Sequence, residues 1–158
     1  MTTNTKVQVG QQVADFTLPS STGKEISLHD YKGKKVVIYF YPKDMTPGCT
    51  TESCEFRDFN GQFQTHNAEV IGISPDGLAS HDEFIAKYEL PFPLLADTTH
   101  RVSQQFGVWK LRSWGGKEFM GIERSTFLIN EDGVLQREWR EVTVEGHVNE
   151  VLEAVKQG

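Results

Sequence analysis

The sequence predicts an α/β fold in which helices flank a central mixed β-sheet. Three observations lead to this prediction. Segments with the pattern of buried strands alternate with segments of helical periodicity, a β-hairpin follows toward the C-terminus, and an amphipathic helix closes the chain. The chain has 158 residues, which fits one ordinary globular domain, so we expect a single domain over residues 1–158.

The N-terminal part is expected to form a short hairpin followed by a buried strand. Residues 13–18 and 25–28 alternate apolar and polar side chains on either side of a turn-forming Ser-Ser-Thr-Gly segment. Residues 35–41 (KVVIYFY) are β-branched or aromatic at successive positions. Such a run is typical of a central strand that is covered on both faces.

A helix is expected to start near Cys49, because Phe56, Phe59 and Phe63 recur at helical spacing with charged residues between them. Strand and helix patterns continue to alternate through the middle of the chain. They predict a strand at 69–74, a helix at 78–88, a short extended segment at 94–96 and a helical turn or two at 102–106.

The C-terminal part predicts a hairpin and a last helix. Residues 125–129 (STFLI) and 134–139 read as strands, and the Asp-Gly pair between them suits a hairpin turn. Residues 144–156 predict a helix with one apolar face, formed by Val148, Val151, Leu152 and Val155. The order of all these elements matches a thioredoxin-like architecture with an N-terminal β-hairpin.

The charge balance excludes several classes of partner. The formal net charge is -6, so the chain lacks the basic surplus that would neutralise nucleic-acid phosphates or anionic lipids. No apolar run approaches the ~20 residues that span a bilayer, and the N-terminus lacks the apolar core of a signal peptide. We therefore expect a cytoplasmic protein that binds neither nucleic acid nor membrane.

The two cysteines, Cys49 and Cys54, are the first candidates for chemistry. Most free cysteines are buried and inert. Cys49, however, follows a Pro-Gly turn at the start of a helix, where unpaired N–H groups and the helix dipole favour a thiolate, and a second cysteine lies five positions further on. A zinc site is not expected, because no histidine forms a close pair with the cysteines; the histidines are His29, His66, His81, His100 and His147.

The residues around Cys49 resemble a known family. Pro42, Thr46 and Cys49 reproduce the P-x-x-x-T-x-x-C motif of the peroxiredoxins. The run 44–58 (DMTPGCTTESCEFRD) is similar to the bacterioferritin co-migratory protein, or peroxiredoxin Q, branch, and so are 73–76, 80–81, 87–97 and 121–129. The resemblance extends from about residue 13 to about residue 155. It implies a cofactor-free thiol peroxidase with a thioredoxin-like fold, a monomer that thioredoxin reduces.

The resemblance also implies a role for each motif residue. Cys49 would be the peroxidatic cysteine, which attacks the peroxide and becomes a sulfenic acid, and Cys54 would resolve it as an intramolecular disulfide. Thr46 would offer its hydroxyl to the peroxide and the thiolate, and Pro42 would shield the sulfur from solvent. Arg124 corresponds to the family's active-site arginine, which would stabilise the thiolate and hold the peroxide oxygens.

Four positions have a second interpretation from the residues alone. Thr46 could be a turn residue and Pro42 a strand terminator. Arg124 could equally be a surface arginine paired with Glu123 or Asp132. Glu52 could be an acid that stabilises the helix N-terminus or a residue that orients Arg124. Residues 111–116 (LRSWGG) depart from the branch, and we expect a loop there whose role the sequence does not reveal.

Two other functions remain as alternatives. A thiol–disulfide oxidoreductase on the same fold would normally carry C-x-x-C, whereas four residues separate Cys49 from Cys54 here. A non-catalytic redox sensor or a chaperone-like binding module could use the same pair of cysteines as a switch. Helix geometry adds an expectation of its own: positions five apart lie roughly 140° apart around the axis, with Cα atoms about 8 to 9 Å apart, so a disulfide requires local unwinding.

Overall fold

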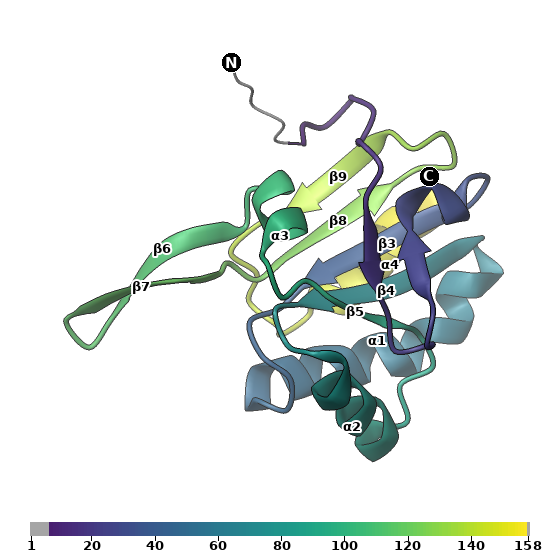
Figure 1. The fold of residues 1–158 in the computed structure, drawn as a ribbon. Coiled ribbons are helices and arrows are strands. Elements are labelled where there is room, and N and C mark those ends of the chain that lie inside the picture. Colours follow the sequence, from purple (N-terminus) through teal and green to yellow (C-terminus); the bar gives the residue numbers. More distant parts are fainter. Residues whose placement is uncertain (1–6, 158) are drawn as a thin grey trace.

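The computed structural model describes residues 7–157, apart from the side chain of Trp114. Its centre is a five-stranded sheet with the strand order β5-β4-β3-β8-β9 (Figure 1). Strands β3, β4 and β5 are parallel, whereas β8 and β9 run antiparallel to their neighbours, which confirms the mixed sheet. The strands span Lys35–Phe40 (β3), Ala68–Ser74 (β4), Leu94–Ala96 (β5), Ser125–Ile129 (β8) and Leu135–Trp139 (β9).

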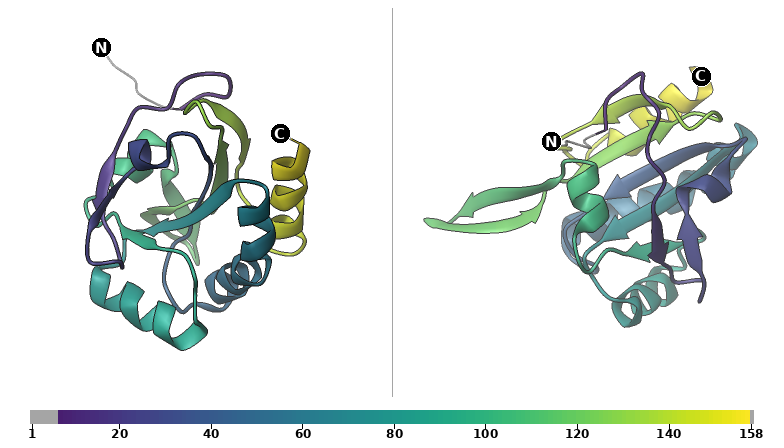
Figure 2. Two further views of the ribbon diagram at one scale, coloured as in Figure 1. Left: turned by 90° about the vertical axis from the view of Figure 1, so that its right-hand side faces the viewer. Right: turned by 45° about the horizontal axis from the view of Figure 1, so that its top comes forward.

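Helices and the N-terminal hairpin cover the two faces of this sheet. All six residues of β3 are buried, and their alternate side chains enter two separate cores. One core packs against the helices α1 (Pro47–Thr65), α2 (Leu78–Tyr88) and α4 (His147–Gln157). The other packs against α3 (Arg101–Gln105) and the N-terminal segment, so the helices lie on both sides of the sheet, as Figure 2 shows.

The N-terminal hairpin is present but shorter than expected. It consists of β1 (Thr17–Pro19) and β2 (Glu25–Ser27), which pair antiparallel and lead into a short 3₁₀ helix at Leu28–Tyr31. The bounds of α2, β5 and β8 agree with those expected from the sequence, and α4 begins three residues later than expected. No helix of residues 7–157 is long and apolar enough to cross a membrane.

The prediction of a loop at residues 111–116 is wrong. Strands β6 (Trp109–Trp114) and β7 (Lys117–Ile122) form an antiparallel hairpin that projects from the body of the molecule (Figure 1). Its tip is the pair Gly115 and Gly116, with φ of 61° and 81°. Two residues with positive φ make the turn that best suits a tight hairpin, and glycine adopts it without strain. The Gly-Gly pair between Trp114 and Lys117 was therefore a hairpin signal.

A close contact between β3 and α1 positions the start of the helix. Tyr39 of β3 stacks on Phe56 of α1 with ring centroids 4.6 Å apart, and its hydroxyl lies 2.8 Å from the Ser53 hydroxyl. Gly72 on the neighbouring strand leaves room for this ring, because a Cβ there would lie 2.8 Å from Tyr39. Helix α1 is thus fixed against the sheet just beyond its first turns.

Candidate active site

Cys49 lies in the first turn of α1, at the end of the turn that follows β3. Thr46 precedes the helix in an extended conformation, and Pro47 occupies its first position, where the missing N–H is of no consequence. Cys49 is fully buried at the base of this turn. The structure thus confirms that Cys49 lies in the first turn of a helix. The unpaired N–H groups of such a turn favour negative charge nearby.

The guanidinium of Arg124 lies directly against this thiol. Arg124 Nη2 is 3.3 Å from Cys49 Sγ, and Arg124 Nη1 donates to Glu52 Oε1 at 2.7 Å. Gly48 makes the approach possible, since a Cβ at this position would lie 3.1 Å from Nη2. The interpretation of Arg124 as a surface arginine paired with Glu123 or Asp132 is therefore wrong.

Glu52 orients Arg124 from the second turn of α1. The interpretation of Glu52 as a first-turn acid is wrong, because the first turn contains no acidic residue. Burial raises the pKa of Glu52 to about 7, although Arg124 acts in the opposite direction. Burial of the guanidinium works against its charge, yet Glu52 and Cys49 together raise the pKa of Arg124. Glu52 therefore holds one end of the guanidinium by an ion pair while the other end remains directed at the Cys49 sulfur.

Thr46 and Pro42 lie close to this cluster in the chain. The Thr46 hydroxyl donates to the backbone oxygen of Lys43 at 2.9 Å, so in this structure it braces the turn. Pro42 is exposed and lines an open pocket that reaches the Arg124 side chain. The sequence did not reveal the other residues of this pocket, which are Arg112, Ile122, Glu123, Glu141 and Val142.

Cys54 is half-buried on the same helix as Cys49, and both thiols are free. Positions five apart on a helix have Cα atoms roughly 8 to 9 Å apart and side chains roughly 140° apart. A disulfide needs Cα atoms within about 7 Å and converging Cβ atoms. The two cysteines therefore cannot bond while α1 remains a regular helix.

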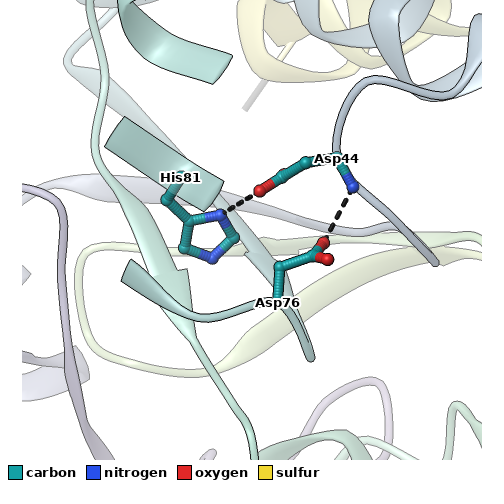
Figure 3. A group of neighbouring side chains, drawn as sticks. All are labelled: Asp44, Asp76 and His81. Carbon is teal, nitrogen blue, oxygen red and sulfur yellow. Dashed lines mark hydrogen bonds and ion pairs between the residues drawn. The ribbon is translucent and has the colours of Figure 1, made fainter. Parts of the chain in front are cut away.

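One group of possible metal ligands occurs among the described residues: Asp44, Asp76 and His81 (Figure 3). One donor atom from each lies within 4.8 Å of the others. Their atoms are, however, already engaged within the protein: His81 Nδ1 faces Asp44 Oδ2 at 2.7 Å, and Asp76 Oδ2 accepts from the Asp44 backbone N–H at 2.8 Å. The group is accordingly a hydrogen-bond network, which the sequence did not predict because its members lie up to 37 residues apart.

Comparison with known proteins gives consistent matches. The profile of the AhpC/TSA family matches residues 9–138. The chain is 51% identical over 150 residues to "Peroxiredoxin Bcp" of Bacillus subtilis, covering 95% of this chain and 96% of that protein. It is 38% identical over 151 residues to "Peroxiredoxin Bcp" of Escherichia coli K12, covering 96% and 97%.

Solved structures agree with the sequence matches. A peroxiredoxin Q of Xanthomonas campestris superposes with a TM-score of 0.86 at 42% identity, covering 90% of each chain. A PrxQ mutant of Xylella fastidiosa superposes with a TM-score of 0.92 at 38% identity, covering 98% of each chain. The region matched by the family profile contains Cys49, Cys54 and Arg124.

Proposed function

Because this chain belongs to the peroxiredoxins of the AhpC/TSA family, we propose that it reduces peroxides with Cys49 as the nucleophile. The observation that carries the assignment of Cys49 is the 3.3 Å contact between its sulfur and the guanidinium of Arg124. A related structure, that of the Xanthomonas campestris bacterioferritin comigratory protein, is described in terms of its alkyl peroxide reduction activity. We extend this substrate class to the present chain, together with hydrogen peroxide.

The first step is an in-line displacement at a peroxide oxygen. The Cys49 thiolate attacks one oxygen, the O–O bond breaks, and the departing oxygen takes up a proton to leave as water or an alcohol. Negative charge builds on that oxygen, so donors aimed at it accelerate the reaction. Arg124, the Cys49 backbone N–H and the Thr46 hydroxyl supply such donors, the last once it turns away from Lys43. Pro42 shields the sulfur at the mouth of the site.

The second step restores the thiol. Cys49 is left as a sulfenic acid, and the Cys54 thiolate attacks its sulfur to form a disulfide; the S–O bond breaks, and the departing hydroxide takes up a proton to become water. Thioredoxin then reduces this disulfide by dithiol exchange, which returns both thiols. We assign the cycle to a monomer in the cytoplasm, where thioredoxin is maintained in its reduced form.

A coupled assay tests this function. Purified protein with thioredoxin, thioredoxin reductase and NADPH should consume many equivalents of hydrogen peroxide or organic hydroperoxide per protein molecule. Replacing thioredoxin with glutaredoxin and glutathione tests the identity of the reductant. Reduction of insulin without peroxide consumption would instead favour the thiol–disulfide oxidoreductase, and consumption limited to one equivalent would favour a redox sensor.

Replacement of Arg124 tests the role of its guanidinium. Arg124→Ala should slow the attack on peroxide by about 10²- to 10³-fold, the usual effect of losing one donor to a developing oxyanion. Arg124→Lys should recover only part of the rate, because lysine lacks the planar fork that reaches Cys49 and Glu52 together. The measurement is stopped-flow oxidation of the reduced protein.

The matched control for this experiment is Arg101→Ala. Arg101 lies on α3, where its guanidinium donates to the backbone oxygen of Thr17 at 3.0 Å, away from the cysteines. This variant should keep the wild-type rate. Equal rates for Arg124→Ala and Arg101→Ala would contradict the proposed role of Arg124.

A further inference from the structure

A buried hydrogen-bond network lies behind the turn that leads into α1 (Figure 3). At its centre, His81 Nδ1 lies 2.7 Å from Asp44 Oδ2, with the two side chains 0% and 1% exposed. The Asp44 carboxylate also accepts hydrogen bonds from the hydroxyls of Tyr41 at 2.6 Å and Ser80 at 2.8 Å. The Asp44 backbone N–H donates to Asp76 at 2.8 Å. This residue is thus held through both its side chain and its backbone.

Both ring nitrogens of His81 have hydrogen-bond partners, which fix the orientation of the ring. His81 Nε2 lies 3.0 Å from the backbone oxygen of Leu95, which can only accept, so Nε2 bears a proton. Since Nδ1 faces a carboxylate oxygen, one more proton lies between His81 and Asp44. The hydroxyls of Tyr41 and Ser80 donate to the same carboxyl group, so hydrogen bonds from three side chains hold Asp44 in place. Burial raises the pKa of Tyr41, so its hydroxyl remains a donor.

The network is connected to the reactive cysteine through a strained turn. Asp44 lies five residues before Cys49, and the intervening Met45 has φ of 63°. This left-handed conformation is uncommon for residues other than glycine and persists only where the surroundings hold it. The bonds of Asp44, through its side chain and its backbone, hold the chain next to Met45. The position of the first turn of α1, and with it Cys49, therefore depends on this anchor.

We propose that Asp44 and His81 form a buried hydrogen-bonded pair that positions Cys49 for attack on peroxide. The proposal rests on the peroxidase function given above. Both are positioning residues, because they act through the turn at Met45 and not on the peroxide. Breaking the pair leaves an uncompensated buried group and releases the turn, so the Cys49 sulfur shifts relative to the guanidinium of Arg124. A displacement of about 1 Å in a reacting group can slow a reaction roughly a hundredfold.

A kinetic experiment tests the proposal by comparing the variants Asp44→Asn and Asp97→Asn. Asp97 is also fully buried, and its carboxylate accepts from the backbone N–H groups of Val102 and Ser103 and from the Ser103 hydroxyl, at the start of α3. Asp44→Asn should slow oxidation of Cys49 by peroxide about tenfold or more, whereas Asp97→Asn should stay within about twofold of wild type.

The outcomes separate the positioning role from the proposed function. Ser80→Ala, which removes one donor to Asp44, is a milder variant and should give an intermediate rate. A wild-type protein that does not react with peroxide would refute the peroxidase function itself. A reactive wild-type protein whose Asp44→Asn variant is no slower than Asp97→Asn would refute the positioning role alone.

Discussion

Replacement of Cys49 by serine should reduce peroxide turnover to the uncatalysed background while the protein remains folded. A serine hydroxyl is almost un-ionised at neutral pH and cannot replace a thiolate as a nucleophile toward peroxide oxygen. Loss of a nucleophile in other enzymes has cost on the order of 10⁶-fold in turnover. The substitution is nearly isosteric at a fully buried position, so the packing around α1 should change little.

The matched control for Cys49→Ser is Cys54→Ser. If Cys54 only resolves the sulfenic acid, this variant should still consume one equivalent of peroxide at the wild-type rate and then fail to turn over with thioredoxin. Stopped-flow fluorescence and mass spectrometry of the oxidised products distinguish the two variants. Sustained turnover by Cys49→Ser would show that the nucleophile lies elsewhere, and full thioredoxin-dependent turnover by Cys54→Ser would remove Cys54 from the cycle.

Most of the fold could be predicted because its elements carry local signals. Strand β3 is apolar on both faces, and α4 presents one apolar stripe, so their periods are visible in short windows. The hairpin of β6 and β7 was missed because it projects from the body, and its exposed residues show no alternation imposed by a core. Only its Gly115-Gly116 turn pointed to a hairpin.

Some contacts of the candidate site could likewise be predicted from the sequence, and others could not. Pro42, Thr46 and Cys49 lie in one turn and one helix start, so their proximity follows from the chain itself. Arg124 lies 75 residues from Cys49, and only the family resemblance suggested that the two meet. Nothing in the sequence joined Asp44 to His81, because their contact depends on how α2 packs beside the turn after β3. Contacts between distant segments are set by tertiary packing, which local patterns do not encode.

The structure also shows which contacts oppose formation of the proposed disulfide. Unwinding α1 from Cys49 to Arg57 would break the contact of Ser53 with Tyr39 and remove Phe56 from its stack on the same ring. It would also break the 2.7 Å hydrogen bond from Arg57 to the backbone oxygen of Tyr88 at the end of α2. Exposing one phenylalanine costs about 2 kcal/mol. The oxidised segment is therefore expected to be less stable than the reduced one, with the disulfide holding it open.

Oxidation to the Cys49–Cys54 disulfide should accordingly unfold residues 49–57 and leave the rest of the domain protected. The later part of α1 stays packed because Phe63 is fully buried against the sheet, so amides near the end of the helix should exchange at similar rates in both redox forms. Amides of residues 49–57 should lose at least about a hundredfold in protection, which corresponds to roughly 3 kcal/mol of local stability. The same change separates Cys49 from Arg124, so the site that activates the thiol is dismantled until thioredoxin reduces the disulfide. Amide hydrogen exchange with mass spectrometry on both redox forms measures the protection of residues 49–57. The Cys54→Ser variant, which cannot form the disulfide, should show no loss of protection on oxidation. Equal protection of residues 49–57 in a sample whose disulfide is verified would contradict the mechanism, because a regular helix cannot bring the two sulfurs together.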